Sequence, residues 1–152
     1  MAMVDASLVL DAIVAVSIAA GALFAVVQLR EMARDRRTEL MLRFADIWLT
    51  PEFEGVVSKL VLAKFNNREE AEKACPREGL VFVGDYFETI SQYVKYGLLD
   101  RDYVLHIYPV EWFWEKLKPW IVDMRSATGI EGMHHTFEWL AGEDRKMRIA
   151  EE

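Results

Sequence analysis

Cysteine is almost absent from this chain, with Cys75 as the single example among 152 residues. One cysteine excludes an intramolecular disulfide and any paired-cysteine metal site, and it fits a reducing compartment. Cys75 precedes Pro76 in a polar segment, which favours a structural thiol over a nucleophile. The chain also lacks a nucleophile elbow and a phosphate-binding loop with its lysine. We therefore find no motif for covalent catalysis or nucleotide binding.

Charge is absent from the segment 12–29, which reads AIVAVSIAAGALFAVVQL. A helix of this length spans about 27 Å, close to the thickness of the hydrocarbon core of a bilayer. The core helix of a soluble protein seldom lacks charge over such a length, and a signal peptide would need a basic region before its apolar run. We therefore predict one transmembrane helix near the N-terminus.

Basic residues are missing before this span, and four arginines follow it. The positive-inside rule then predicts an inner-membrane protein with its N-terminus outside and its C-terminal domain in the cytoplasm. Arginines at this position also attract anionic lipid, although fixing the topology is a sufficient role for them. The four residues are Arg30, Arg34, Arg36 and Arg37.

Small residues recur every fourth position within the span, at Ser17, Gly21 and Ala25. This pattern allows two transmembrane helices to approach closely. It predicts a helix–helix contact in the membrane, with either a second copy of this chain or another membrane-protein subunit as the partner.

Proline is absent between Asp11 and Thr50, and no stretch alternates apolar and polar residues as a strand does. We predict an all-α fold in which one N-terminal transmembrane helix continues into a stalk as far as about Leu49 and is followed by a small cytosolic helical bundle. The expected divisions are a membrane anchor with a basic juxtamembrane stalk at 1–37, a helical domain at 38–142 and a charged tail at 143–152.

Capping residues mark the starts of three helices in the domain, at Thr50, Asn67 and Asp100. The end of the stalk carries an apolar stripe at helical spacing, which should dock on the domain. The residues of this stripe are Leu40, Met41, Phe44, Ile47 and Trp48.

Glycine and proline mark the other boundaries. Gly97 is expected to end a helix in the left-handed conformation, with Leu98 supplying the accompanying apolar contact. Pro109 should open a helix, Pro119 should kink or divide it, and Gly142 should end the last helix. The expected helices cover about 51–65, 67–74, 78–96, 100–107, 110–124 and 133–141.

The net charge of −7 lies entirely after residue 37, because residues 1–37 hold four acidic and four basic residues. Nucleic-acid binding needs clustered positive charge, so we expect no nucleic-acid partner.

Three segments together resemble a known family: Lys95–Asp100 (KYGLLD), Trp114–Arg125 (WEKLKPWIVDMR) and Phe137–Ala141 (FEWLA). With the N-terminal span and the arginine-rich stalk, they resemble a family of small prokaryotic membrane-anchored helical proteins classed as a domain of unknown function. The resemblance implies this architecture, and it implies no activity or catalytic residue.

Histidine and carboxylate spacing offers one candidate metal site, at Glu131 and His134, which matches half of the Glu-x-x-His pattern of di-metal bundles. The second pair that such a site needs is missing. Asp102 and His106, which are four residues apart, form another acid–histidine pair, and we interpret them as a capping acid and a surface histidine. We therefore expect no metal, no cofactor and no enzymatic activity, with a metal-dependent activity at Glu131 and His134 as an alternative.

Aromatic residues concentrate between Tyr103 and Trp139, and Trp112 and Trp120 fall outside the main apolar stripe of their helix. Either another helix covers them, or they form a partner surface, since tryptophan is frequent in protein interfaces. We therefore predict a non-enzymatic protein that acts through protein–protein contacts, most simply as an accessory or assembly subunit of a membrane complex. A self-associating signalling or stress-response element is the alternative.

Overall fold

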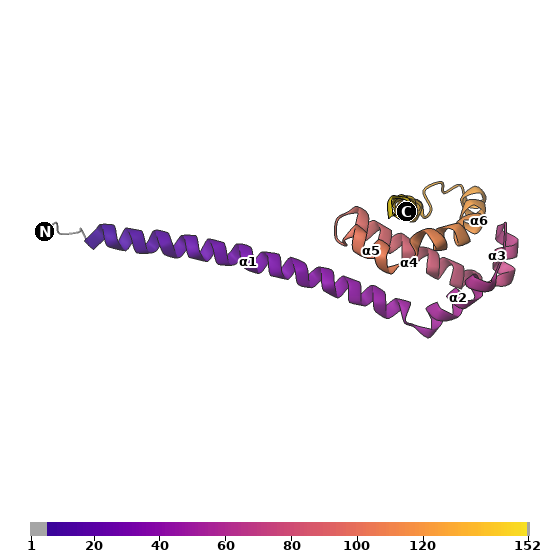
Figure 1. Ribbon diagram of the computed structural model, residues 1–152, viewed down its shortest axis with the longest axis horizontal. Helices are drawn as coiled ribbons and strands as arrows, with labels where there is room; N and C mark the ends of the chain where they lie inside the picture. The colour runs from indigo at the N-terminus through magenta and orange to yellow at the C-terminus, as the bar shows by residue number, and fades with distance from the viewer. Residues whose placement is uncertain (1–5, 152) are drawn as a thin grey trace. The chain divides into compact units, whose positions relative to one another are not determined.

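The computed structural model describes residues 6–151, and within them it contains helices and no strand (Figure 1). The predicted all-α fold is confirmed. The described chain divides between Glu39 and Leu40 into two compact units. The helices are α1 (Ala6–Trp48), α2 (Pro51–Leu62), α3 (Arg68–Ala74), α4 (Arg77–Lys95), α5 (Arg101–Ile107), α6 (Val110–Thr128) and α7 (His135–Glu151).

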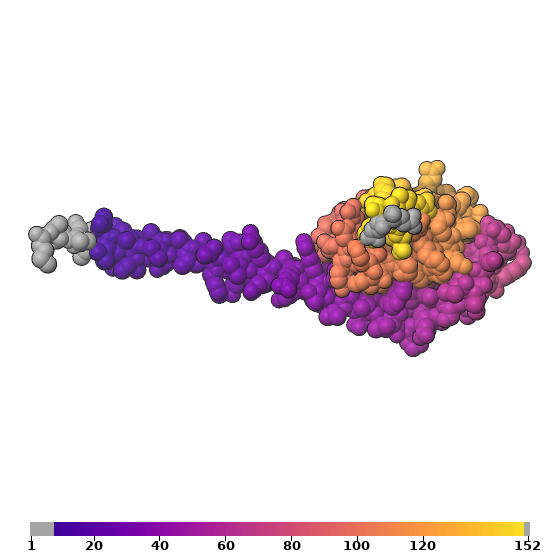
Figure 2. Space-filling model, in the orientation of Figure 1, coloured from indigo at the N-terminus to yellow at the C-terminus, as the bar shows by residue number. Residues whose placement is uncertain are grey.

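The first unit consists of the N-terminal part of α1. Every side chain from Leu8 to Glu39 is exposed in the described structure, and Figure 2 draws this part of α1 in indigo to purple. One 18-residue window of this helix has a mean hydropathy of 2.3, and none of it is buried. The helix is thus long and apolar enough to cross a membrane.

The C-terminal end of α1 belongs to the second unit and packs on its core, as the apolar stripe predicts. Phe44 is buried, and its backbone carbonyl accepts a hydrogen bond of 2.9 Å from the Tyr86 hydroxyl on α4. The Trp48 ring lies 5.0 Å from the Phe53 ring and 5.7 Å from the Phe113 ring, measured between centroids. These contacts join α1 to the bundle.

The core of the second unit lies between α4, α6 and α7, with α2 on α4 and α3 on α6. Phe87 on α4 stacks on Phe137 of α7 with ring centroids 5.1 Å apart, and Phe113 of α6 lies 4.6 Å from Phe87. Burying side chains of this size stabilises a fold by about 1.5–3 kcal/mol each. The side chains that are essentially inaccessible include Phe53, Leu60, Leu80, Val83, Phe87, Ile90, Phe113, Leu117, Trp120, Ile121, Phe137 and Leu140.

The predicted N-caps are confirmed. Side-chain oxygens of Thr50, Asn67 and Asp100 accept hydrogen bonds of 3.3, 2.9 and 2.9 Å from backbone N–H groups three residues further on. Each satisfies one of the free donors at a helix start.

Gly97 ends α4 with a φ of 71°, as predicted. The Leu98 N–H donates to the Tyr93 carbonyl at 2.8 Å and the Gly97 N–H donates to the Val94 carbonyl at 3.0 Å, which is the Schellman pattern. Leu98, which was expected to supply the accompanying apolar contact, is 45% exposed, and the next residue, Leu99, is buried.

Of two further boundary predictions, one fails and one is decided only in part. Pro119 does not divide α6, which runs as one helix from Val110 to Thr128, and a kink at Pro119 stays a prediction. Gly142 does not end α7, so residues 143–151 are helical and do not form a separate tail. A glycine inside a helix costs only about 1 kcal/mol. The packing of Met147 against the core and the hydrogen bonds that Asp144 accepts from the Glu111 N–H and the Arg148 guanidinium offset that cost.

Candidate functional sites

The small residues of the span lie on one side of α1, because residues four apart are neighbours on a helix. The Ser17 hydroxyl donates to the Ile13 carbonyl of its own helix at 2.8 Å. A Cβ atom built at Gly21 would meet nothing within 4 Å. This face, with Ala25, is therefore open to another helix.

The four arginines after the span are all exposed on α1. A helix turns about 100° per residue, so Arg30, Arg34 and Arg37 lie within an arc of about 60°, and Arg36 lies on the other side. No ion pair involves any of the four guanidinium groups within the described residues.

The two candidate tryptophans have different surroundings. Trp120 is 1% exposed, and its indole N–H donates to the Glu72 carboxylate on α3 at 3.3 Å. The prediction that Trp120 contributes to a partner surface is wrong, because α3 packs on α6 and covers it. Trp112 is 37% exposed, and the Lys116 ammonium lies 5.5 Å from its ring centroid. Trp112 therefore presents a partly accessible indole beside a cation.

Glu131 and His134 do not form a helical ligand pair. Glu131 is exposed in a turn, and α7 begins only at His135. His134 is buried with a φ of 53°, and it packs against Gly84 of α4. Among the described residues, no group of three histidine, cysteine or acidic side chains is arranged to hold a metal ion.

His134 is instead the buried member of a polar cluster at the start of α7. Its Nε2 atom lies 3.9 Å from the Asp85 carboxylate, and its Nδ1 atom is buried without a hydrogen bond within the described structure. Arg125 of α6 donates to the Met133 carbonyl at 2.8 Å and to the Glu138 carboxylate at 2.9 Å. Arg125 thereby fixes the backbone immediately before His134.

The electrostatics of this cluster favour a neutral imidazole. Burial lowers the pKa of His134 and the positive charge of Arg125 adds to this effect, while Asp85 and Glu88 oppose it. A protonated imidazole is thus disfavoured in the folded protein, because desolvation penalises the charged form.

Three carboxylates cap helices other than their own, and sequence reasoning missed all of them. Asp123 of α6 accepts from the Arg68 N–H of α3 at 2.8 Å, and Asp144 of α7 accepts from the Glu111 N–H of α6 at 2.8 Å. Glu88 of α4 accepts from the Phe137 N–H of α7 at 2.8 Å. The sequence gives one indication of such a cap. Pro109 precedes α6 and has no side chain that could accept a hydrogen bond, so the start of α6 needs an acceptor from elsewhere.

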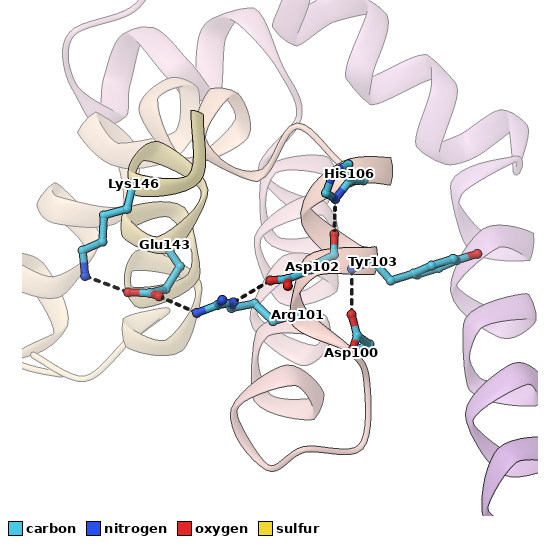
Figure 3. A network of polar contacts seen from close by, with 7 residues as sticks. All are labelled: Asp100, Arg101, Asp102, Tyr103, His106, Glu143 and Lys146. Carbon is cyan, nitrogen blue, oxygen red and sulfur yellow. Dashed lines mark hydrogen bonds and ion pairs between the residues drawn. The ribbon is translucent and has the colours of Figure 1, made fainter. Parts of the chain in front are cut away.

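A surface network joins α5 to α7 (Figure 3). Arg101 contacts the Asp102 carboxylate at 3.0 Å and the Glu143 carboxylate at 3.1 Å, and Lys146 contacts Glu143 at 2.7 Å. The Nδ1 atom of His106 lies 2.6 Å from the Asp102 backbone carbonyl oxygen. The hollow beside the network encloses about 380 Å³. The cations of the network, Arg101 and Lys146, pair with its acids. The hollow therefore presents no unbalanced charge for a ligand.

These features together define an all-α protein in which one long, apolar and uncovered helix is continuous with a helical domain. Residues 15–143 match the family model described as Domain of unknown function (DUF4760). The chain therefore belongs to the DUF4760 family. Comparison with curated proteins and with solved structures gives no match.

Proposed function

We propose that this protein is a single-pass membrane protein whose helical domain lies on the cytoplasmic side and acts through contacts with other membrane proteins. The observation that carries the membrane anchor is the exposure of every side chain from Leu8 to Leu29 on an apolar helix. Large apolar side chains favour insertion by roughly 0.3–0.6 kcal/mol each. Lipid is the environment that accommodates such a surface without a protein partner.

The proposed orientation, with the N-terminus outside and the inner membrane as location, is supported by the arginines that follow the span at Arg30, Arg34, Arg36 and Arg37. Carbonate washing and protease protection in inner-membrane vesicles test both points. The proposal expects the protein to stay in the membrane fraction, and it expects digestion of the domain only from the cytoplasmic face. Extraction by carbonate would contradict the anchor, and digestion from the periplasmic face would contradict the orientation.

Two observations support protein contact as the mode of action. Trp112 keeps 37% of its surface exposed on a domain that buries its other large aromatic side chains on α6. The face with Ser17, Gly21 and Ala25 is open in α1. An accessory or assembly subunit would use both surfaces, one in the membrane and one outside it.

Self-association as a signalling or stress-response element is the second candidate, favoured by the same open face around Gly21. Extraction in mild detergent followed by mass spectrometry of the intact complex distinguishes the two. A heteromeric complex that is weakened by Trp112→Ala supports the accessory subunit. A homodimer that dissociates on Gly21→Leu supports self-association.

Val122→Ala is the matched control for Trp112→Ala, because Val122 is 43% exposed on the same helix. Equal effects of the two variants would argue against a specific role for Trp112. A wild-type protein that is monomeric in mild detergent, with neither a partner nor a second copy, would contradict both forms of the contact hypothesis.

A further inference from the structure

We propose that Arg30, Arg34 and Arg37 form a one-sided binding surface for the phosphate groups of anionic phospholipids at the C-terminal end of the span. This inference rests on the proposed membrane anchor, and it adds a specific lipid class and a specific face of the helix. We call these three residues the arginine stripe.

The rotation of the helix separates the stripe from the neighbouring charges. Relative to Arg30, the positions of Arg34 and Arg37 are turned by about 40° and −20°, since each residue adds about 100°. Glu31 and Asp35 are turned by about 100° and 140°. The acidic residues of this segment therefore centre on another part of the helix surface, with Glu31 about 60° and Asp35 about 100° from Arg34, and the stripe itself contains only positive charge.

The depth of the stripe matches the headgroup layer. That layer extends about 5–8 Å beyond the hydrocarbon core, and a helix rises about 1.5 Å per residue. Taking Leu29 as the last apolar residue, Arg30 and Arg34 lie within the layer, and the backbone of Arg37 lies about 12 Å beyond Leu29. Side chains on a helix lean toward its N-terminus, so the guanidinium of Arg37 extends back toward the phosphates.

The guanidinium groups of the stripe are available for such contacts. All three side chains are exposed, and within the described residues none makes an ion pair that lipid binding would have to break. Arginine binds phosphate through two parallel N–H···O hydrogen bonds, which a lysine at the same place would not provide.

The test uses the full chain reconstituted in phosphatidylcholine membranes that contain a fraction of phosphatidylglycerol. Spin-labelled versions of the two lipids report by electron paramagnetic resonance how strongly each associates with the protein. We expect phosphatidylglycerol to be preferred, and we expect Arg34→Gln to reduce this preference by up to about fivefold at low salt. The triple variant Arg30→Gln/Arg34→Gln/Arg37→Gln should show no preference.

Arg36→Gln is the matched control, because it removes the same charge two residues from Arg34 and on the other side of α1. It should retain most of the preference. Equal losses in Arg34→Gln and Arg36→Gln would overturn the one-sided surface, and so would a wild-type protein with no preference for phosphatidylglycerol.

Two further results separate the remaining explanations. If 10-fold excess inorganic phosphate over the anionic lipid abolishes the preference at constant ionic strength, the stripe binds soluble phosphate and the lipid assignment is overturned. A chain that does not insert into phosphatidylcholine membranes contradicts the anchor itself. A chain that inserts fully but has no lipid preference contradicts only the arginine stripe.

Discussion

The carboxylate of Asp144 on α7 accepts a hydrogen bond of 2.8 Å from the backbone N–H of Glu111 on α6. Asp144 is fully buried, and its other oxygen accepts from the Arg148 guanidinium at 2.9 Å. Because Pro109 gives α6 no side-chain cap, Asp144 supplies the cap from a different helix. The acid thus joins the start of α6 to the middle of α7.

Replacing Asp144 tests the contribution of this contact between α6 and α7 to stability. We expect Asp144→Ala to lower the free energy of unfolding by about 1.5–3 kcal/mol, because a charge-assisted hydrogen bond is lost and a helix start loses its partner. Chemical denaturation of the full chain in mild detergent, followed by circular dichroism, measures it. The neighbouring Glu143→Ala removes only surface ion pairs with Arg101 and Lys146 and should cost less than about 1 kcal/mol. Equal costs would refute the special role of Asp144.

Gly84 provides a second prediction, based on the space between α4 and the loop before α7. A Cβ atom at this position would lie 3.0 Å from Cε1 of His134 and 3.2 Å from its Nε2. We expect Gly84→Ala to destabilise the protein by about 1–3 kcal/mol through overpacking. In a His134→Ala background the same substitution should cost clearly less, since the ring that it meets is gone.

Gly142→Ala is the control for Gly84→Ala. A Cβ atom at Gly142 meets nothing within 4 Å, and the residue lies inside α7. This substitution should therefore stabilise the protein, by up to about 1 kcal/mol, through helix propensity alone. Thermal unfolding temperatures of the two variants should move in opposite directions, and a parallel shift would contradict the model of a close contact at Gly84.

Acidification should destabilise the domain through His134. Burial holds the pKa of His134 below its ordinary value, so the folded protein binds fewer protons than the unfolded chain. Its contribution to stability is complete above the unfolded pKa of about 6.5 and is lost as the pH falls below that value. Arg125 strengthens the effect, while Asp85 and Glu88 weaken it.

Unfolding free energies measured at pH 7.5 and pH 5.5 check this expectation. The wild-type protein should lose stability between the two values, and His134→Gln should reduce the loss. His106→Gln serves as the control because His106 is exposed on α5. A decrease that is the same in all three proteins would assign the pH dependence to other groups.

Much of the fold could be predicted because its signals are local. Thr50 and Asn67 cap helices within their own neighbourhoods in the sequence, and Gly97 ends α4 through its left-handed conformation. The apolar stripe around Phe44 follows helical spacing, so its docking was also foreseeable.

The failures have a common physical origin in contacts between distant residues. Trp120 falls outside the main stripe of α6, but α3 packs there and its Glu72 bonds to the indole. Gly142 indicates a helix end by composition, but Asp144 bonds to Glu111 across the bundle and stabilises the continued helix. No local pattern contains such pairings, since they depend on tertiary packing.

Cys75 offers a final prediction, which concerns reactivity. It is the C-cap residue of α3, it is 1% exposed, and burial raises the pKa of its thiol. Because the thiolate is the reactive form, both effects slow its modification. We expect the folded protein to react with Ellman's reagent far more slowly than the denatured protein. A Cys75→Ala/Ser58→Cys variant is the matched control, because Ser58 is exposed on α2 and its replacement should react at the rate of a free thiol. Rapid reaction of wild-type Cys75 under native conditions would show that α3 opens from the bundle.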